Sequence, residues 1–129
     1  MILDTSFVVD LMDRQPDAVN KFWAIQGQGN QFVTTPTIFE LWSGIARSSR
    51  PEQEKRKVLE VLDSQLILEL DEESAEEGGK IDGILINEGL RIDPEDCMIA
   101  GIAKRHQEKV LTRNVKHFGR IKGLSLELY

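Results

Sequence analysis

Short apolar runs alternate with amphipathic stretches along the chain, and this pattern predicts an α/β fold. Apolar and β-branched runs predict strands at residues 2–3, 31–35, 65–70, 109–112 and 124–129. Apolar residues at helical spacing predict helices at 7–12, 17–26, 37–49, 52–64, 71–88 and 93–107. Because strands and helices alternate, we expect a three-layer α/β/α domain with a mainly parallel sheet of about five strands.

Proline and glycine mark where several of these helices begin and end. Each of the four prolines is placed to open a helix, since its fixed φ suits the first helical position. We expect Thr35 to cap the helix that starts at Pro36, and Asp93 to cap the helix that starts at Pro94. Gly89 is expected to end the helix before it.

The composition is that of an ordinary globular protein. At 129 residues, with 40% hydrophobic and 29% charged residues, the chain is expected to form one domain over 1–129. Its single cysteine, Cys97, excludes an internal disulfide and favours a reducing cytoplasm. The apolar start is too short for a signal peptide, and no run reaches membrane-spanning length.

Charge is distributed unevenly along the chain. The net charge of −6 argues against a general nucleic-acid coat protein. Residues 104–129, however, contain seven lysines and arginines against two glutamates. These basic residues either line solvated surfaces or form a phosphate-facing edge, and composition alone leaves both interpretations open.

Four oxygen-bearing side chains occupy equivalent places in the predicted fold: Asp4, Glu40, Asp96 and Asn114. Each follows a predicted strand or lies near the start of a predicted helix. Because the carboxyl ends of parallel strands meet at one edge of a sheet, we expect all four to converge on one crevice. A site of this kind binds a hard divalent cation such as Mg²⁺.

Each residue also has a purely structural interpretation. Asp4 is well placed to cap a helix, and periodicity places Glu40 on a solvated face. Asp96 lies on the inward stripe of its helix, where a carboxylate needs either backbone N–H groups or a cation. Asn114 alone would be a turn residue. No single position decides between the alternatives.

The other candidate residues are assigned to packing. His106 and His117 have no companions at metal-ligand spacing, so we interpret both as surface or packing residues. Trp23 and Trp42 lie in apolar stripes, which favours packing for them as well.

The chain resembles the PIN-domain ribonucleases, in particular the VapC toxins of prokaryotic toxin–antitoxin pairs. The similarity extends over nearly the whole length. It begins at "ILDTSFVVDLM", continues through "TTPTIFELWSGI", and is most specific in "IDPEDCMIAGIAKRH" and "VLTRNVKHFGRIKGL".

This resemblance implies roles for individual residues. Asp4, Glu40 and Asp96 match the metal-binding acids, and Asn114 stands where many members have a fourth aspartate. Ser6 and Thr112 match polar positions that support the pocket. The resemblance further implies Mg²⁺ or Mn²⁺, cleavage of single-stranded or looped RNA, a homodimer, and inhibition by a small antitoxin protein.

From these assignments we expect metal-assisted hydrolysis of an RNA phosphodiester. Arg113 and Lys116 adjoin the predicted site and are candidate phosphate contacts. Asn114 carries no charge, which makes a second tightly bound metal less favourable. Two alternatives stay open: an inactive PIN-like module that binds RNA or protein, and an RNA-processing nuclease without an antitoxin.

Overall fold

The computed structural model describes residues 1–129, and at its centre lies a five-stranded sheet. Its strands are β1 (Ile2–Leu3), β2 (Phe32–Thr34), β3 (Leu66–Leu68), β4 (Val110–Leu111) and β5 (Leu126–Glu127). They lie in the order β3-β2-β1-β4-β5, and every neighbouring pair is parallel. The predicted parallel α/β sheet is therefore confirmed.

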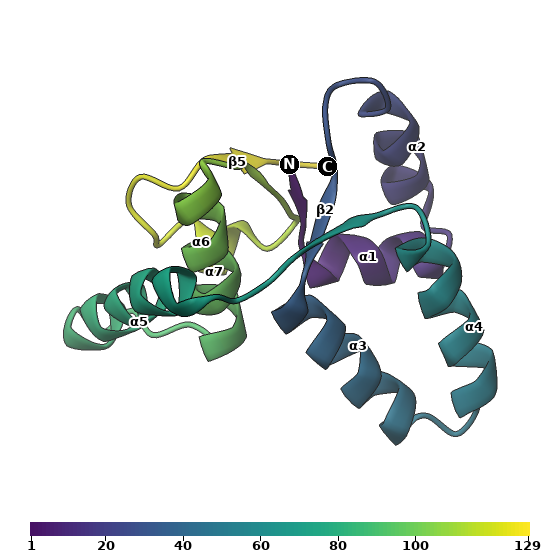
Figure 1. The fold of residues 1–129 in the computed structure, drawn as a ribbon, viewed down its shortest axis with the longest axis horizontal. Helices are drawn as coiled ribbons and strands as arrows, with labels where there is room; N and C mark the ends of the chain where they lie inside the picture. Colours follow the sequence, from purple (N-terminus) through teal and green to yellow (C-terminus); the bar gives the residue numbers. More distant parts are fainter.

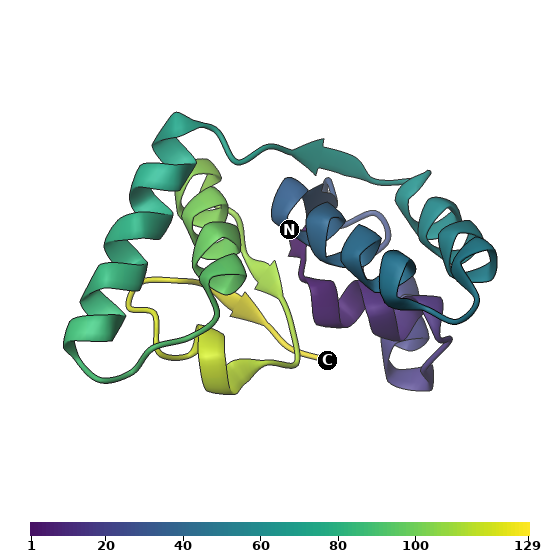
Figure 2. The ribbon, with the colours of Figure 1, turned by 90° about the horizontal axis from the view of Figure 1, so that it is seen from below.

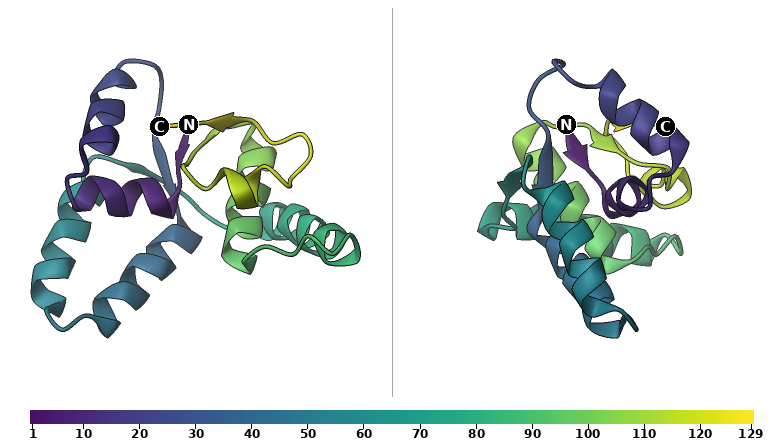
Figure 3. Two further views of the ribbon diagram at one scale, coloured as in Figure 1. Left: turned by 180° about the vertical axis from the view of Figure 1, so that it is seen from behind. Right: turned by 90° about the vertical axis from the view of Figure 1, so that its right-hand side faces the viewer.

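Seven helices surround the sheet. They are α1 (Thr5–Met12), α2 (Pro16–Ala24), α3 (Thr35–Arg47), α4 (Pro51–Leu62), α5 (Glu72–Asn87), α6 (Pro94–His106) and α7 (Val115–Phe118). Figure 1 shows α1 to α4 on one side of the central strands and α5 to α7 on the other. Figure 3 shows the same separation from behind. None of these helices combines the length and the apolar composition that a membrane crossing requires.

Two hydrophobic cores back the two faces of the sheet. Ile2 and Val110 pack with residues of α5, α6 and α7, whereas Leu3 and Leu111 pack with residues of α1 to α4. This division follows from the strand geometry, since successive side chains point to opposite faces. The two central strands are buried on both faces, which explains why they read as short apolar runs without alternation.

The strand order reverses direction at β1 and β4. From β1 the chain proceeds to β2 and β3 on one side, and it then returns to β4 and β5 on the other. In Figure 2, β3 lies in the stretch of chain that crosses from α4 to α5. A crevice forms outside the carboxyl ends of strands at such a reversal, and this is the usual ligand site of open parallel sheets.

The structure corrects several local predictions. Thr34 rather than Thr35 occupies the N-cap of α3, where its hydroxyl accepts a hydrogen bond from the Thr37 amide. Asp93 occupies the N-cap of α6 but makes no capping hydrogen bond with its side chain. Residues 113–121, where the sequence predicts neither a strand nor a helix, contain α7, which at four residues is too short to show a hydrophobic period.

Both tryptophans differ from their predicted packing role. Trp23 is 68% exposed and Trp42 is 43% exposed. Apolar residues do recur at helical spacing in α2 and α3, but only some of them in each helix pack against the core. The remainder of each stripe faces solvent.

Candidate active site

Asp4 lies at the carboxyl end of β1 and is the most constrained of the predicted site residues. One of its carboxylate oxygens accepts a hydrogen bond from the Ser6 amide, and the other accepts hydrogen bonds from the hydroxyls of Ser6 and Thr112. Its side chain is almost fully buried. Burial raises the pKa of Asp4 above its ordinary value, although the bonds from Thr112 and Ser6 act in the opposite direction.

Glu40 reaches the same region from α3. The Thr5 hydroxyl donates a hydrogen bond of 2.9 Å to its Oε1, which links the start of α1 to α3. The residue is half-buried, so the solvated surface position indicated by periodicity is wrong. Burial raises the pKa of Glu40, and the nearby charges of Asp96, Glu95 and Asp4 raise it further.

Asp96 approaches from the opposite side, on the first turn of α6. Its side chain is 15% exposed, and its Oδ2 lies 2.9 Å from Nδ1 of His117. Burial raises the pKa of Asp96, and the charge of Asp4 acts in the same direction, whereas the contact with His117 lowers it. The inward orientation predicted for Asp96 agrees with this position.

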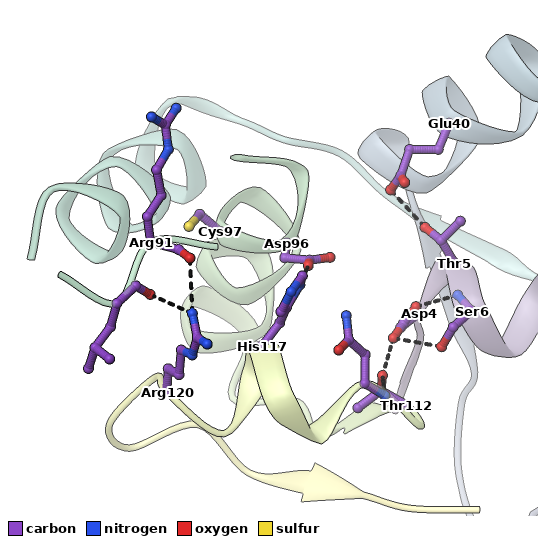
Figure 4. Close-up of polar contacts among 12 residues, drawn as sticks. Asp4, Thr5, Ser6, Glu40, Arg91, Asp96, Cys97, Thr112, His117 and Arg120 are labelled. Carbon is purple, nitrogen blue, oxygen red and sulfur yellow. Dashed lines mark hydrogen bonds and ion pairs between the residues drawn. The ribbon is translucent and has the colours of Figure 1, made fainter. Parts of the chain in front are cut away.

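Three carboxylates thus approach one another from β1, α3 and α6, near the point where the strand order reverses (Figure 4). Their pKa values are all raised, chiefly because each is partly removed from water, and the charges of neighbouring acids raise those of Glu40 and Asp96 further. Without a cation, repulsion among the three carboxylates raises the free energy of the folded protein, and a bound cation lowers it by offsetting their negative charge.

The remaining predicted residues differ in how closely they join this group. Thr112 is fully buried. Its hydroxyl donates a hydrogen bond to Asp4 and accepts one of 2.8 Å from the backbone amide of Asn114. Asn114 is half-buried at the N-cap of α7, where its side chain makes no capping bond. Lys116 is exposed on α7.

Arg113 has a partner other than a phosphate. Its Nη1 lies 2.8 Å from Oδ2 of Asp10, a buried carboxylate on α1, although 59% of its side chain remains exposed. Other basic residues of the C-terminal segment also have partners within the protein: Lys104 bonds to the Lys122 carbonyl, and Arg105 pairs with Asp71. Lys116 has no such partner and stays available.

His117 is the residue that sequence reasoning missed. It was expected to be a surface or packing residue, but it contacts Asp96 directly and is 29% exposed. Asp93, Asp96 and His117 are the one group of three potential ligands whose atoms all lie within 4.8 Å of one another. The two contact residues are 21 positions apart, and only the packing of α7 against α6 brings them together.

Comparison with known proteins yields consistent similarities. Residues 1–124 match the profile of the family described as PIN domain. The chain is 30% identical to the "tRNA(fMet)-specific endonuclease VapC" of Shigella flexneri, a match covering 98% of this chain and 95% of the relative. It is 28% identical to "Ribonuclease VapC2" of Haemophilus influenzae, with coverage of 98% and 95%.

Solved structures resemble this fold closely. VapBC2 of Rickettsia felis, solved bound to a DNA fragment from its promoter, superposes with a TM-score of 0.90 at 26% identity, covering 98% of this chain and 96% of that one. DNA-bound VapBC of Salmonella typhimurium gives a TM-score of 0.88 at 27% identity, with the same coverage.

Proposed function

This chain belongs to the PIN domain family, and from that membership we propose that it is a divalent-cation-dependent endoribonuclease. The observation that carries the proposal is the convergence of Asp4, Glu40 and Asp96 from three elements at the reversal point of the sheet. Relatives of nearly equal length that bear the names endonuclease and ribonuclease favour the same activity.

The donor set fits a hard divalent cation. Asp4, Glu40 and Asp96 offer carboxylate oxygens, the ligands that Mg²⁺ and Mn²⁺ prefer, and we propose that these three hold the ion. Their raised pKa values fit a site in which a bound cation stabilises the ionised carboxylates. When bound, the cation supplies Lewis-acid activation of the phosphodiester and of water at neutral pH.

The chain's own residues orient these carboxylates and handle the proton. Ser6 and Thr112 hold Asp4, and Thr5 holds Glu40 through the hydrogen bonds described above. Because burial raises the pKa of each of the three acids, one of these carboxylates would accept the proton of the water that attacks phosphorus. We propose that the half-buried Asn114 presents its neutral amide to the same pocket.

We propose single-stranded or looped RNA as the substrate. Lys116 is exposed and free of ion pairs on α7, one residue before His117, so it is the first candidate for a phosphate contact. Arg113 would contribute its charge while remaining paired with Asp10. The other basic side chains of this segment are largely engaged within the protein, which confines the proposed RNA contact to a short stretch.

We further propose that the chain works in the cytoplasm as the toxin of a toxin–antitoxin pair, as a homodimer in complex with a small antitoxin protein. The similar structures named VapBC favour such a partner. A cavity of about 580 Å³ adjoins Glu40 between α1, α3 and α4, and the exposed Phe39 lies in its wall. A partner segment seated there would lie next to Glu40.

The test is cleavage of a panel of structured RNAs, including the initiator tRNA named for the Shigella relative. Purified protein is assayed with Mg²⁺, Mn²⁺ or EDTA, alongside Asp96→Asn and, as a control, Asp17→Asn at the exposed start of α2. We expect cutting that EDTA abolishes. We also expect Asp96→Asn to lower the rate at least about a hundredfold, the upper end of the effect for residues that only support metal ligands.

Two results would contradict the proposal. Cutting that persists in Asp96→Asn would place the activity elsewhere or in a contaminant. RNA binding without cutting, under either metal and across the panel, would favour the alternative of a PIN-like module that binds RNA without cleaving it.

A further inference from the structure

The tightest group of potential metal ligands is displaced from the proposed three-carboxylate site. It consists of Asp93, Asp96 and His117, whose ligand atoms all lie within 4.8 Å of one another. Figure 4 shows the side chains of Asp96 and His117 pointing toward each other, on the side of Asp96 away from Asp4 and Glu40. The group therefore shares Asp96 with the proposed site and adds a nitrogen donor to it.

The side chains of Asp93 and His117 make no contacts that would compete with a cation apart from the bond to Asp96. Asp93 stands at the N-cap of α6, yet its carboxylate makes no capping hydrogen bond and pairs with no cation of the protein. The ring of His117 makes one hydrogen bond, through Nδ1, and that bond is to Asp96. Two carboxylates and one imidazole are thus held together where α6 meets α7, and they keep oxygen and nitrogen atoms free to coordinate a cation.

The separation of the two central atoms is compatible with joint coordination. Nδ1 of His117 and Oδ2 of Asp96 are 2.9 Å apart. Two ligands at right angles on one ion, each about 2.1 Å from it, are about 3.0 Å apart. A cation can therefore replace the shared proton of this pair with little movement of either side chain.

The nitrogen donor determines which cation would bind. Imidazole is a good ligand for first-row transition metals, whereas Mg²⁺ is held by carboxylates, waters and phosphates. We propose that Asp93, Asp96 and His117 form a second cation site that takes a first-row transition-metal dication in preference to Mg²⁺. This inference rests on the proposed function only through Asp96, which would bridge the two sites with its two oxygens.

The test uses Mn²⁺ as a paramagnetic probe and the other histidine as a matched control. The untagged full-length protein, freed of metal, is loaded with Mn²⁺ and examined by pulsed electron paramagnetic resonance for coupling to ¹⁴N. His117→Gln removes the proposed ligand, and His106→Gln removes the exposed histidine at the end of α6. Thermal unfolding of each variant verifies that it is folded.

We expect ¹⁴N coupling in the wild type and in His106→Gln, and none in His117→Gln. By titration, His117→Gln should weaken Mn²⁺ binding at least about tenfold, and excess Mg²⁺ should leave the nitrogen signal of the wild type in place. Absence of nitrogen coupling in the wild type, or its persistence in His117→Gln, would overturn the proposal. Displacement of the signal by Mg²⁺ would overturn the proposed preference.

Asp4→Asn separates this inference from the proposed nuclease function. If both proposals hold, the variant loses RNA cleavage but keeps the nitrogen-coupled Mn²⁺ signal, because Asp4 is not a ligand of the second site. If the nuclease proposal alone fails, no variant changes cleavage while the nitrogen signal still depends on His117. If the second site alone fails, cleavage depends on Asp4 and no nitrogen signal is present.

Discussion

Asp4 caps α1 and also faces the other acids, so the two interpretations that the sequence left as alternatives are compatible. Its Oδ1 accepts a hydrogen bond from the Ser6 amide and so caps α1, while its carboxylate faces the other acids of the site. Thr112 completes this arrangement from β4, since its hydroxyl donates to Asp4 and accepts from the Asn114 amide. One buried hydroxyl thus links the first strand, the fourth strand and the start of α7.

Replacement of that hydroxyl is expected to affect both folding and activity. Thr112→Val preserves the shape of the side chain but leaves the Asn114 amide without its acceptor and Asp4 without one donor. We expect chemical denaturation to report a loss of about 1–3 kcal/mol, the usual cost of a buried polar group left unpaired. Under the proposed function, the rate of RNA cleavage should fall about 10–100-fold.

Thr112→Ser is the matched control, because it keeps the hydroxyl and removes only a methyl group. It should retain most of the cleavage rate while losing some packing energy. Equal cleavage by Thr112→Val and the wild type would show that Asp4 needs no support from β4.

The residue scale also shows where sequence reasoning succeeded and where it stopped. The inward position of Asp96 follows from its place on the apolar stripe of one helix, a local property. The partly buried position of Glu40 depends on Thr5, which is 35 residues away, and periodicity within α3 carries no information about it. The contact of His117 with Asp96 is likewise non-local.

At the scale of elements, α5 and α6 pack closely through glycines. A Cβ atom added to Gly101 on α6 would lie 2.4 Å from the Ser74 carbonyl oxygen and 2.6 Å from the Gly78 amide nitrogen of α5. These are backbone atoms, which cannot move aside as the end of a flexible side chain can. The close approach fixes where α6 begins relative to the sheet and therefore where Asp96 points.

Gly101→Ala is expected to destabilise the fold by at least about 2 kcal/mol, because overpacking against backbone forces the helices apart. Gly79→Ala on α5 is the control, since a Cβ atom there meets nothing within 4 Å. That change should stabilise the protein by about 0.5–1 kcal/mol, the gain for replacing glycine within a helix. Urea denaturation of both variants measures the difference, and equal effects would contradict the close approach.

Asp71 at the start of α5 predicts a pH dependence of stability whose sign follows from its hydrogen bonds. The Ser74 amide donates a 2.8 Å hydrogen bond to its carboxylate, and this bond, assisted by Arg105, lowers the pKa of Asp71 below its ordinary value. The resulting stabilisation is present above the unfolded pKa of about 3.9 and is lost as pH falls through the lower folded value.

Asp71→Asn should therefore lower the melting temperature at pH 7 and have progressively less effect below about pH 4. Asp17→Asn, which removes an exposed aspartate in the first turn of α2, is the comparison. Calorimetry of the three proteins from pH 7 downward tests this expectation. A melting-temperature difference between wild type and Asp71→Asn that grows on acidification would contradict the assigned sign.

At the scale of the whole molecule, alternation of strands and helices was enough to predict a parallel α/β sheet. The strand order β3-β2-β1-β4-β5 was not predictable in the same way, because pairing is a contact between segments far apart in sequence. Each strand contains only two or three residues, so none shows the alternation that would distinguish an edge strand from a central one. The expectation of a site at this edge of the sheet needed less information, because a reversal point requires only that parallel strands lie on both sides of β1.

The last residue of the chain ties the edge of this sheet to the first helix. Tyr129 follows β5, and its ring meets that of Phe7 on α1 edge to face, with centroids 4.8 Å apart. Its hydroxyl donates a 2.7 Å hydrogen bond to Oδ2 of Asp10, the buried carboxylate that also pairs with Arg113. The C-terminus thus helps to satisfy a buried charge next to the proposed RNA contact.

Tyr129→Phe isolates the hydroxyl from the ring. Asp10 is only 6% exposed, so loss of this donor leaves a buried carboxylate dependent on Arg113 alone. We expect a loss of about 1.5–3 kcal/mol, the range for hydrogen bonds to charged groups, and a smaller loss when Asp10→Asn is already present, because the two side chains are directly coupled. Denaturation of the two single variants and the double variant measures that coupling. Additive losses would mean that the Tyr129 hydroxyl is not coupled to Asp10, and β5 would then be held to α1 by the packing of the Tyr129 ring against Phe7 without a polar tie.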